Sequence, residues 1–223
     1  MAEGSRIVTL DGPGGVGKTT VARNVAARLD VAYLDTGAMF RAVAMALGQG
    51  GWELPEDELS RALETVRFDL TGAGDASVLL VNGQPLPESA RTEEVGVWAS
   101  NLGRLKVVRS FLKGRQRHIG RQRDLVVEGR DMGTVVFPGA RHKFFLDASL
   151  EERARRRWLQ LREQGREEPL QAIRDSLGLR DRQDRNRAVA PLKPAADALR
   201  IDTTRRSLAE VLELILETIA AGR

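Results

Sequence analysis

The chain carries a glycine-rich segment near its N-terminus, Gly12-Pro13-Gly14-Gly15-Val16-Gly17-Lys18-Thr19, which matches the pattern G-x-x-x-x-G-K-[ST]. The apolar run of residues 7–10 before it is typical of a short buried strand, and residues 18–29 after it have a helical pattern. Glycines let backbone N–H groups turn toward an anion, and the N-terminus of a helix adds positive potential. The strand, the loop and the helix in this order therefore predict a P-loop that binds the phosphates of a nucleoside triphosphate.

Two side chains of this segment are expected to hold the phosphates and their metal ion. In a P-loop, Lys18 reaches the β- and γ-phosphates and the hydroxyl of Thr19 ligates Mg²⁺. A glycine-rich turn can match the pattern by chance, but the flanking strand and helix argue against that interpretation. The main question is then where the γ-phosphoryl group of the nucleotide goes.

The composition narrows the classes of protein that remain. The 223 residues can form one larger domain or two small ones, and they include no cysteine, so neither disulfides nor thiol chemistry are expected. The N-terminal residues lack a signal-peptide pattern, and no segment is long and apolar enough to span a bilayer. We therefore expect a cytoplasmic protein with no membrane partner.

The net charge of +4 raises the alternative of a nucleic-acid partner. The positive residues are mostly arginines interleaved with acidic residues, as in residues 180–187, and there is neither a lysine-rich tail nor an aromatic platform for stacked bases. Arginine is suited to bidentate contacts with phosphate groups. We therefore expect small phosphorylated molecules, and no nucleic acid, as partners.

Strand and helix patterns alternate along the chain, which predicts an α/β fold with a mostly parallel sheet. A capping box of Ser207 and Glu210 begins the last helix, and Ser149 with Glu152 predicts a second capping box at the start of a helix over residues 150–164. The predicted strands are residues 6–10, 32–34, 125–127, 143–146 and 199–201. The apolar face of the last helix consists of Leu208, Val211, Leu212, Ile215, Leu216 and Ile219.

Two long segments interrupt this alternation within a single domain. About ninety residues separate the second and third strands, far more than a crossover helix needs. Within them, residues 66–70 and 77–81 alternate like strands, and Asn82-Gly83 is a strong hairpin signal. We predict a core of residues 1–36, 110–149 and 195–223, an insert with a small antiparallel sheet over residues 37–109, and a helical, arginine-rich lid over residues 150–194.

Candidate site residues follow two of the predicted strands. Arg41 can clamp a second phosphate facing the P-loop, with Thr36 beside it; alternatively Thr36 caps a helix and Arg41 is solvated. Glu128 ends the third strand, where P-loop proteins usually keep a carboxylate on the Mg²⁺ side. Arg130 and Asp131 then offer a phosphate donor and a base-edge acceptor, although they can also form a plain salt bridge in a turn.

Arg153 and Arg157 lie four residues apart in the predicted helix and so project from one face. A solvated helix with Glu–Arg pairs is the ordinary explanation. Beside a P-loop we favour a mobile lid that brings both arginines onto the transferring phosphoryl group, because that chemistry depends on positioning, water exclusion and charge stabilisation. Lys18, Arg153 and Arg157 are thus the predicted catalytic residues. The chain lacks the N-K-x-D sequence of GTPases and the H-R-D and D-F-G segments of protein kinases.

Five stretches of the chain together resemble the bacterial cytidylate kinases, a branch of the nucleoside monophosphate kinases. They are residues 11–20 (DGPGGVGKTT), 34–41 (LDTGAMFR), 91–95 (RTEEV), 128–138 (EGRDMGTVVFP) and 184–191 (DRNRAVAP). The resemblance covers nearly the whole chain. It implies a P-loop kinase core with a five-stranded parallel sheet flanked by helices, a monophosphate-binding insert and a mobile lid.

The resemblance also implies roles for individual residues. ATP would be bound by Gly12, Pro13, Gly14, Gly15, Val16, Gly17, Lys18, Thr19 and Thr20. The CMP phosphate would be held by Arg41, Arg130 and Arg187, the cytosine by Ser100, Arg109 and Asp131, and the ribose hydroxyls by Arg180 and Asp184. Thr36 belongs to the same CMP site and stands where many members carry serine. Glu128, which stands where aspartate is frequent, would support Mg²⁺ together with Thr19.

The implied activity is transfer of the γ-phosphoryl group of ATP to CMP or dCMP, with Mg²⁺ as cofactor. We expect the protein to be a monomer. One alternative is another small-molecule P-loop kinase, such as a UMP or dephospho-coenzyme A kinase, and the cytosine-reading residues argue against it. The other is a nucleotide-gated RNA-binding protein, motivated by the arginine-rich residues 150–187, which would bind RNA with a steep dependence on salt.

Overall fold

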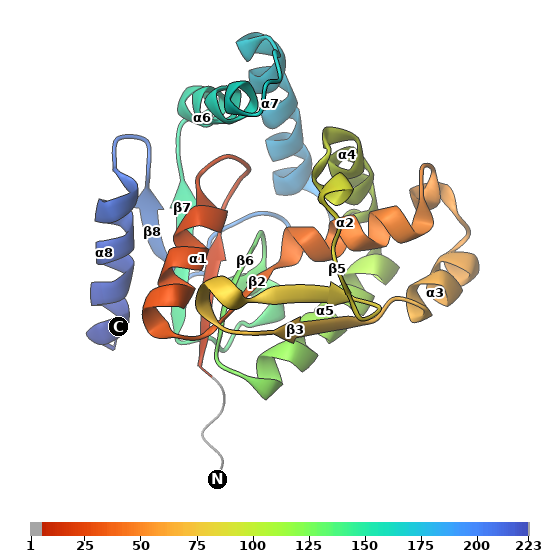
Figure 1. The fold of residues 1–223 in the computed structure, drawn as a ribbon, viewed down its shortest axis with the longest axis horizontal. Coiled ribbons are helices and arrows are strands. Elements are labelled where there is room, and N and C mark those ends of the chain that lie inside the picture. The colour runs from red at the N-terminus through yellow and green to blue at the C-terminus, as the bar shows by residue number, and fades with distance from the viewer. Residues whose placement is uncertain (1–5, 223) are drawn as a thin grey trace.

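A parallel sheet of five strands forms the centre of the computed structural model, which describes residues 6–222 (Figure 1). The strands lie in the order β2-β6-β1-β7-β8, and every neighbouring pair is parallel. The five predicted strands are confirmed, each within two residues of its expected bounds. They are β1 (Ile7–Asp11), β2 (Ala32–Asp35), β6 (Leu125–Gly129), β7 (His142–Asp147) and β8 (Leu199–Asp202).

Helices α1 (Lys18–Leu29) and α8 (Leu208–Ala220) pack together on one face of this sheet. Their apolar side chains form one core cluster with Leu10 of β1 and Phe144 of β7, both of which are fully buried. A strand that is covered by helices on both faces is apolar on both sides, which explains why the central strands read as continuous apolar runs rather than as alternating patterns.

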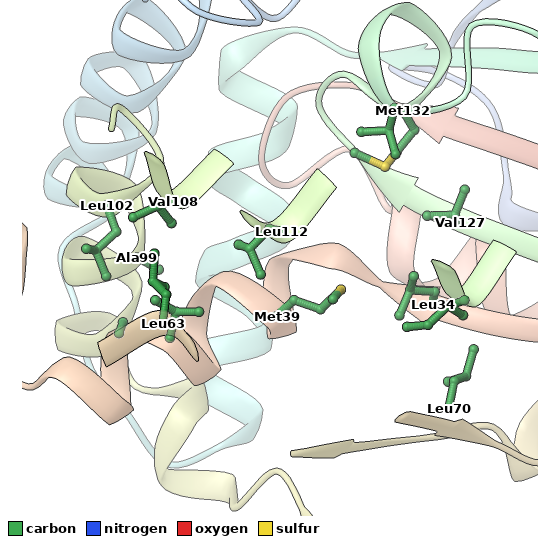
Figure 2. Close-up of a cluster of buried hydrophobic side chains, with 14 of the residues drawn as sticks. Leu34, Met39, Leu63, Leu70, Ala99, Leu102, Val108, Leu112, Val127 and Met132 are labelled. Carbon is green, nitrogen blue, oxygen red and sulfur yellow. The ribbon is translucent and has the colours of Figure 1, made fainter. Parts of the chain in front are cut away.

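Helices α2 (Thr36–Leu47) and α5 (Lys106–Gln122) contribute to the core on the other face. Figure 2 shows Leu34 of β2 and Val127 of β6 in one cluster with Met39 of α2. This cluster continues into the segment between β2 and α5, so the insert and the sheet share a single apolar core.

The segment between α2 and α5 contains a small antiparallel sheet with the strand order β3-β4-β5. The Asn82-Gly83 turn, with φ of 50° and 81°, joins β4 to β5, which is the geometry of a primed hairpin turn. The hairpin prediction is confirmed, but the third strand was missed because it is only two residues long. The elements here are α3 (Glu56–Glu64), β3 (Phe68–Thr71), β4 (Val78–Val81), β5 (Gln84–Pro85) and α4 (Glu93–Leu102).

Helices α6 (Leu150–Glu163) and α7 (Leu170–Asn186) pack against each other and project beyond the P-loop (Figure 1). Ala154, Leu161 and Ile173 form their own small core. The helical character expected for residues 150–194 is therefore confirmed for α6 and α7.

The two predicted capping boxes differ in outcome. At α8 both reciprocal bonds between Ser207 and Glu210 are present, as predicted. At α6 the hydroxyl of Ser149 accepts from the Glu152 N–H, but the N–H of Ser149 donates to the hydroxyl of Thr204. The carboxylate of Glu152 is taken by two arginines of its own helix, so the second capping box is wrong in its reciprocal half.

The division into core, insert and lid stays a prediction, and α5 runs across the expected boundary at residues 109–110. Within residues 6–222, no helix has both the length and the apolar character needed to cross a membrane.

Candidate active site

The P-loop lies at the carboxyl edge of the sheet, between β1 and α1, where open α/β sheets bind their ligands. Three of its glycines have positive φ: Gly12 (150°), Gly15 (80°) and Gly17 (91°). A Cβ atom on Gly12 would lie 2.1 Å from the carbonyl oxygen of Leu146 in β7. A residue with a side chain therefore cannot take this place unless the loop moves away from β7.

Lys18 is buried at the start of α1, and its Nζ donates to the carbonyl of Pro13, 2.6 Å away in the same loop. Burial and the cation of Arg130 together lower the pKa of Lys18 to about 7, although Glu128 opposes the shift. An anion bound in the loop would restore the protonated form. The ammonium is thus held where the phosphates of a nucleotide would neutralise it.

Glu128 is a buried carboxylate near the end of β6, 4% exposed. The hydroxyl of Tyr33 donates to its Oε1 at 2.5 Å, and the hydroxyl of Thr36 donates to its backbone carbonyl at 2.7 Å. Burial and the charge of Asp35 raise the pKa of Glu128, while Lys18 and hydrogen bonds from Tyr33 and Thr19 lower it. Thr36, the first residue of α2, is thus hydrogen-bonded to the backbone near the end of β6.

Thr19 and Glu128 offer a hydroxyl and a carboxylate oxygen side by side, which suits Mg²⁺. Among residues 6–222, no group of three or more His, Asp or Glu side chains forms a cage for a metal. Because Mg²⁺ is usually bound by one or two protein oxygens together with substrate phosphates, the two residues fit such an ion.

Asp11 links the P-loop to the neighbouring strand connection. Its carboxylate accepts from the backbone N–H groups of Met132 and Gly133, both at 2.8 Å. These residues open a π-helical turn, Met132–Val136, that follows β6. Burial raises the pKa of Asp11 to about 6, although both hydrogen bonds oppose that shift. Asp11 therefore fixes the segment after Asp131 against the end of β1.

A chain of ion pairs crosses the site from the P-loop side to α5. Arg130 donates to Asp184 at 2.9 Å, and Arg187 pairs with the same carboxylate at 3.2 Å. Arg187 also lies 3.8 Å from Asp131, which receives a 2.6 Å bond from Arg109. Burial raises the pKa of Asp184, but the arginines outweigh it and hold that pKa below its usual value. The structure thus brings together five residues that the sequence spreads over 79 positions.

This network has more cationic donors than partners among the described residues. The Nε atom of Arg180 and the Nη2 atom of Arg187 are buried without a hydrogen-bond partner in residues 6–222. Burial and the cation of Arg130 lower the pKa of Arg180 to about 10. Buried donors of this kind cost free energy unless a ligand satisfies them, so the cluster is suited to an anion.

Arg41 lies on α2 and points toward the segment before α4. Its Nη1 donates to the carbonyls of Ala90 at 2.7 Å and Thr92 at 2.8 Å. Burial lowers the pKa of Arg41, and the carboxylates of Glu93 and Asp35 oppose this. Arg41 is therefore a held and partly buried side chain, rather than a solvated one.

A cavity of about 50 Å³ adjoins the Arg109–Asp131 pair. The guanidinium of Arg109 lies 5.6 Å from the centre of the Phe40 ring, which lines the same cavity together with Gln116. Ser100 is half-buried on α4 and is not among the described residues that line this cavity. The structure therefore joins Arg109 and Asp131, whereas the role of Ser100 stays a prediction.

The two lid arginines reach different parts of the molecule. Arg153 is buried and donates to the carbonyl of Gly14 in the P-loop at 3.1 Å and to Asp181 of α7 at 2.6 Å. Arg157 pairs with Glu93, at the start of α4, and donates to Gln160 at 2.8 Å. Arg153 thus touches the donor loop, whereas Arg157 bridges α6 to the insert.

A second and larger cavity, about 550 Å³, opens on the other side of the P-loop. Val16, Gly17 and Thr20 form one wall, and the segment from Thr203 to Leu208 forms another. Arg156 closes it and donates to the carbonyl of Thr203 at 2.6 Å. The cavity has room for the base and sugar of a nucleotide whose phosphates lie in the P-loop.

Comparison with known proteins places nearly the whole chain in one family, since the model of the cytidylate kinases matches residues 8–221. The chain belongs to the cytidylate kinase family. The cytidylate kinase of Oleidesulfovibrio alaskensis is 53% identical over 213 residues, covering 96% of this chain and 97% of its own. That of Maridesulfovibrio salexigens is 51% identical, covering 95% and 96%, and that of Nitratidesulfovibrio vulgaris is 54% identical, covering 96% and 92%.

The sequence analysis missed several residues that shape this cytidylate kinase site. The hydroxyl of Tyr33 holds Glu128, and the carboxylate of Asp11 holds the π-helical turn. The carboxylate of Asp181 holds Arg153. Their side chains act across distant segments, so no spacing pattern marks them. Arg156 and the segment after β8 form the larger cavity, and the position of that segment at the carboxyl edge of the predicted sheet was the one available signal.

Proposed function

We propose that the protein transfers the γ-phosphoryl group of ATP to CMP or dCMP, giving ADP and CDP or dCDP. The observation that carries this proposal is the buried arginine–carboxylate chain from Arg130 to Arg109, which adjoins the P-loop and retains a buried guanidinium donor without a hydrogen-bond partner. Membership of the cytidylate kinase family supports the same reaction.

ATP binds with its phosphates in residues 12–20 and its adenosine in the larger cavity beside Arg156. This part is supported by the positive-φ glycines, by the buried ammonium of Lys18 and by the cavity of about 550 Å³ next to Thr20. Lys18 contacts the β- and γ-phosphates, because its Nζ already lies inside the loop.

CMP binds with its phosphate on Arg41, Arg130 and Arg187. Arg180 and Asp184 hold the ribose hydroxyls, and Thr36 belongs to the same site. The excess of buried guanidinium donors supports an anionic ligand at this place. A monophosphate is the acceptor group that such a cluster suits best.

Arg109, Asp131 and Ser100 read the cytosine. The carboxylate of Asp131 accepts from the exocyclic amino group, and Arg109 donates to the ring acceptors. Uracil presents the opposite pattern at two of these positions, so it would leave buried polar groups unpaired. The 2.6 Å bond between Arg109 and Asp131 supports this assignment, because it fixes both groups before a base arrives.

Thr19 and Glu128 would hold Mg²⁺ beside the ATP phosphates. The ion, when bound, neutralises charge on the β- and γ-phosphates and helps to orient them. The oxygen chemistry of the two side chains supports this role.

In the transfer step, an oxygen of the CMP phosphate forms a bond to the γ-phosphorus, and the bond from that phosphorus to the bridging oxygen of ADP breaks. The attacking oxygen is anionic at neutral pH, so no strong general base is needed. Lys18, Arg153 and Arg157 offset the charge on the transferring group. Closure of residues 37–109 and 150–194 over the core excludes water, and the protein acts as a monomer.

ADP release from Mg·ATP tests this function when CMP, dCMP, UMP, AMP, GMP and dephospho-coenzyme A are offered separately against a blank without acceptor. We expect strong stimulation by CMP and dCMP and much weaker stimulation by UMP. Stimulation by another acceptor alone would overturn the assignment of the base site. No stimulation by any acceptor, together with salt-dependent binding of RNA, would overturn the kinase assignment itself.

A further inference from the structure

Glu93 is the first residue of α4 and belongs to the R-T-E-E-V segment, whose side chains have no role in the function proposed above. Its carboxylate pairs with Nη2 of Arg157 on α6. The pair connects the insert to the lid, and it occupies an arginine that the proposed mechanism needs on the transferring phosphoryl group.

The surroundings of Glu93 are cationic. Burial lowers the pKa of both Arg41 and Arg180, and in each case the carboxylate of Glu93 opposes the shift. Helix α4 packs closely against α2, which carries Arg41. The carboxylate therefore lies among arginines from three helices, all of which the proposed function assigns to nucleotide binding or phosphoryl transfer.

We propose that Glu93 is a positioning residue that holds Arg157 away from the donor phosphates until the acceptor monophosphate is bound. This inference rests on the proposed function. A phosphate on Arg41 would repel the carboxylate of Glu93, because both are anions close to the same guanidinium. The side chain of Glu93 is 49% exposed, so it can turn into solvent once it is repelled. Arg157 is then free to contact the transferring phosphoryl group, which carries more charge than a carboxylate.

The arrangement matters because water can replace CMP as the acceptor. In that side reaction a water oxygen forms a bond to the γ-phosphorus, the bond to the bridging oxygen of ADP breaks, and the proton of the water passes to solvent. An arginine on the transferring group stabilises this transition state as well as the productive one. By withholding Arg157 when CMP is absent, Glu93 suppresses hydrolysis of ATP.

The experiment compares Glu93→Gln with Glu94→Gln in the full chain. Both substitutions are isosteric and remove one carboxylate from the first turn of α4, so they change the helix terminus equally. Glu94 is exposed, and no described side chain pairs with it in an ion pair. ADP release is measured without acceptor and over a range of CMP concentrations.

We expect Glu93→Gln to raise ADP release without acceptor by roughly tenfold, a fraction of the full effect of an arginine on the transferring group. The KM for CMP should fall by about threefold, because a repulsive charge near its phosphate is gone. Glu94→Gln should stay within about twofold of the unmodified protein in both quantities, as for other exposed charges.

If the Glu93–Arg157 pair only joined the insert to the lid, Glu93→Gln would raise the KM for CMP instead of lowering it. That result, or equal values for the two variants, would overturn the inference. The double variant Glu93→Gln/Arg157→Ala isolates the mechanism, since the increase in hydrolysis should vanish without Arg157; an increase that persists would also contradict it. In the unmodified protein, failure of CMP to stimulate ADP release would instead refute the proposed function.

Discussion

The donor and acceptor sides of the site are built in different ways. The P-loop is one contiguous segment whose shape comes from backbone conformation, with glycines at φ values that side chains rarely adopt. The acceptor side consists of charged side chains from β6, α5 and α7 and the connections that follow them, which hold one another through ion pairs. The first is fixed by local geometry, and the second depends on mutual electrostatic support.

This difference predicts how each side fails. A backbone cradle should tolerate a new side chain only where there is space, and its failure should appear in folding. A network of ion pairs should fail through uncompensated buried charge, and its failure should appear first in binding of the acceptor.

The largest effect is expected for Gly12→Ala. The new Cβ would lie 2.1 Å from the carbonyl oxygen of Leu146. We expect the free energy of unfolding in denaturant to fall by about 4 kcal/mol or more, as for other cases of strain in a packed backbone. Gly14→Ala is the matched control, because its Cβ would lie 3.4 Å from Leu177, an ordinary contact. Equal losses in the two variants would contradict a shape fixed by backbone geometry.

Lys18→Ala should reduce phosphoryl transfer by roughly a thousandfold, because it removes a buried cation aimed at the charge that develops on the phosphates. The fold should survive, since the Nζ makes its hydrogen bond within the loop itself. Steady-state ADP release and thermal unfolding check the two statements. Near-normal turnover in a folded variant would exclude the proposed role of Lys18.

The pH dependence of stability tests the role of Asp11, which joins the P-loop to the segment that follows β6. Its pKa is raised from 3.8 to about 6 in the folded protein, so the folded state binds more protons than the unfolded state between these values. The contribution of Asp11 to stability is therefore fully present below pH 3.8 and is lost as the pH rises through 6. The loss is about 3 kcal/mol in total.

Asp11→Asn cannot titrate and serves as the reference for this pH dependence. The unfolding free energy of the unmodified protein, relative to that of the variant, should fall between pH 4 and pH 6.5 by about 2 kcal/mol, most of the total loss. Denaturant unfolding at several pH values measures this difference. A difference that is constant with pH would show that the burial of Asp11 does not perturb its ionisation.

On the acceptor side, Arg187→Ala should lower kcat/KM for CMP by roughly a hundredfold, the value of a buried charge-assisted contact. Arg187 pairs with Asp184 at 3.2 Å and is 9% exposed, whereas Arg185, 52% exposed, lies 3.8 Å from Asp147. Arg185→Ala is thus the control and should have little effect. Similar losses for both variants would mean that general positive charge, and not the network, binds the acceptor.

The same contrast explains what the sequence could predict. The P-loop, the five strands and the helices that follow the P-loop and end the chain can be predicted from local patterns of glycine and apolar residues, and the structure confirms these elements. The strand β5 escaped prediction because two residues carry no periodicity. The reciprocal half of the Ser149 capping box was wrong because Thr204, 55 positions away, takes the N–H of Ser149.

Position after a predicted strand marked Arg41, Arg130 and Asp131 as candidates, but Arg109, Arg180, Asp184 and Arg187 were accessible only through resemblance. Nothing in the spacing of Arg109, Asp131 and Asp184 indicates that they share one network, since contact between them depends on how α5, β6 and α7 pack. Ser100 illustrates the limit, because no fixed motif surrounds it and its role stays a prediction. Tyr33 lies in a predicted strand and belongs to no motif, so only the structure shows that its hydroxyl contacts Glu128.

The central claim is that the backbone cradle and the side-chain network bind two different nucleotides. Calorimetric titration of Lys18→Ala and Arg187→Ala, each with Mg·ATP and with CMP, tests it most directly. We predict that Lys18→Ala weakens binding of ATP by roughly tenfold or more and leaves CMP unchanged, whereas Arg187→Ala does the reverse. A variant that weakens both ligands equally would contradict the separation of the two sites.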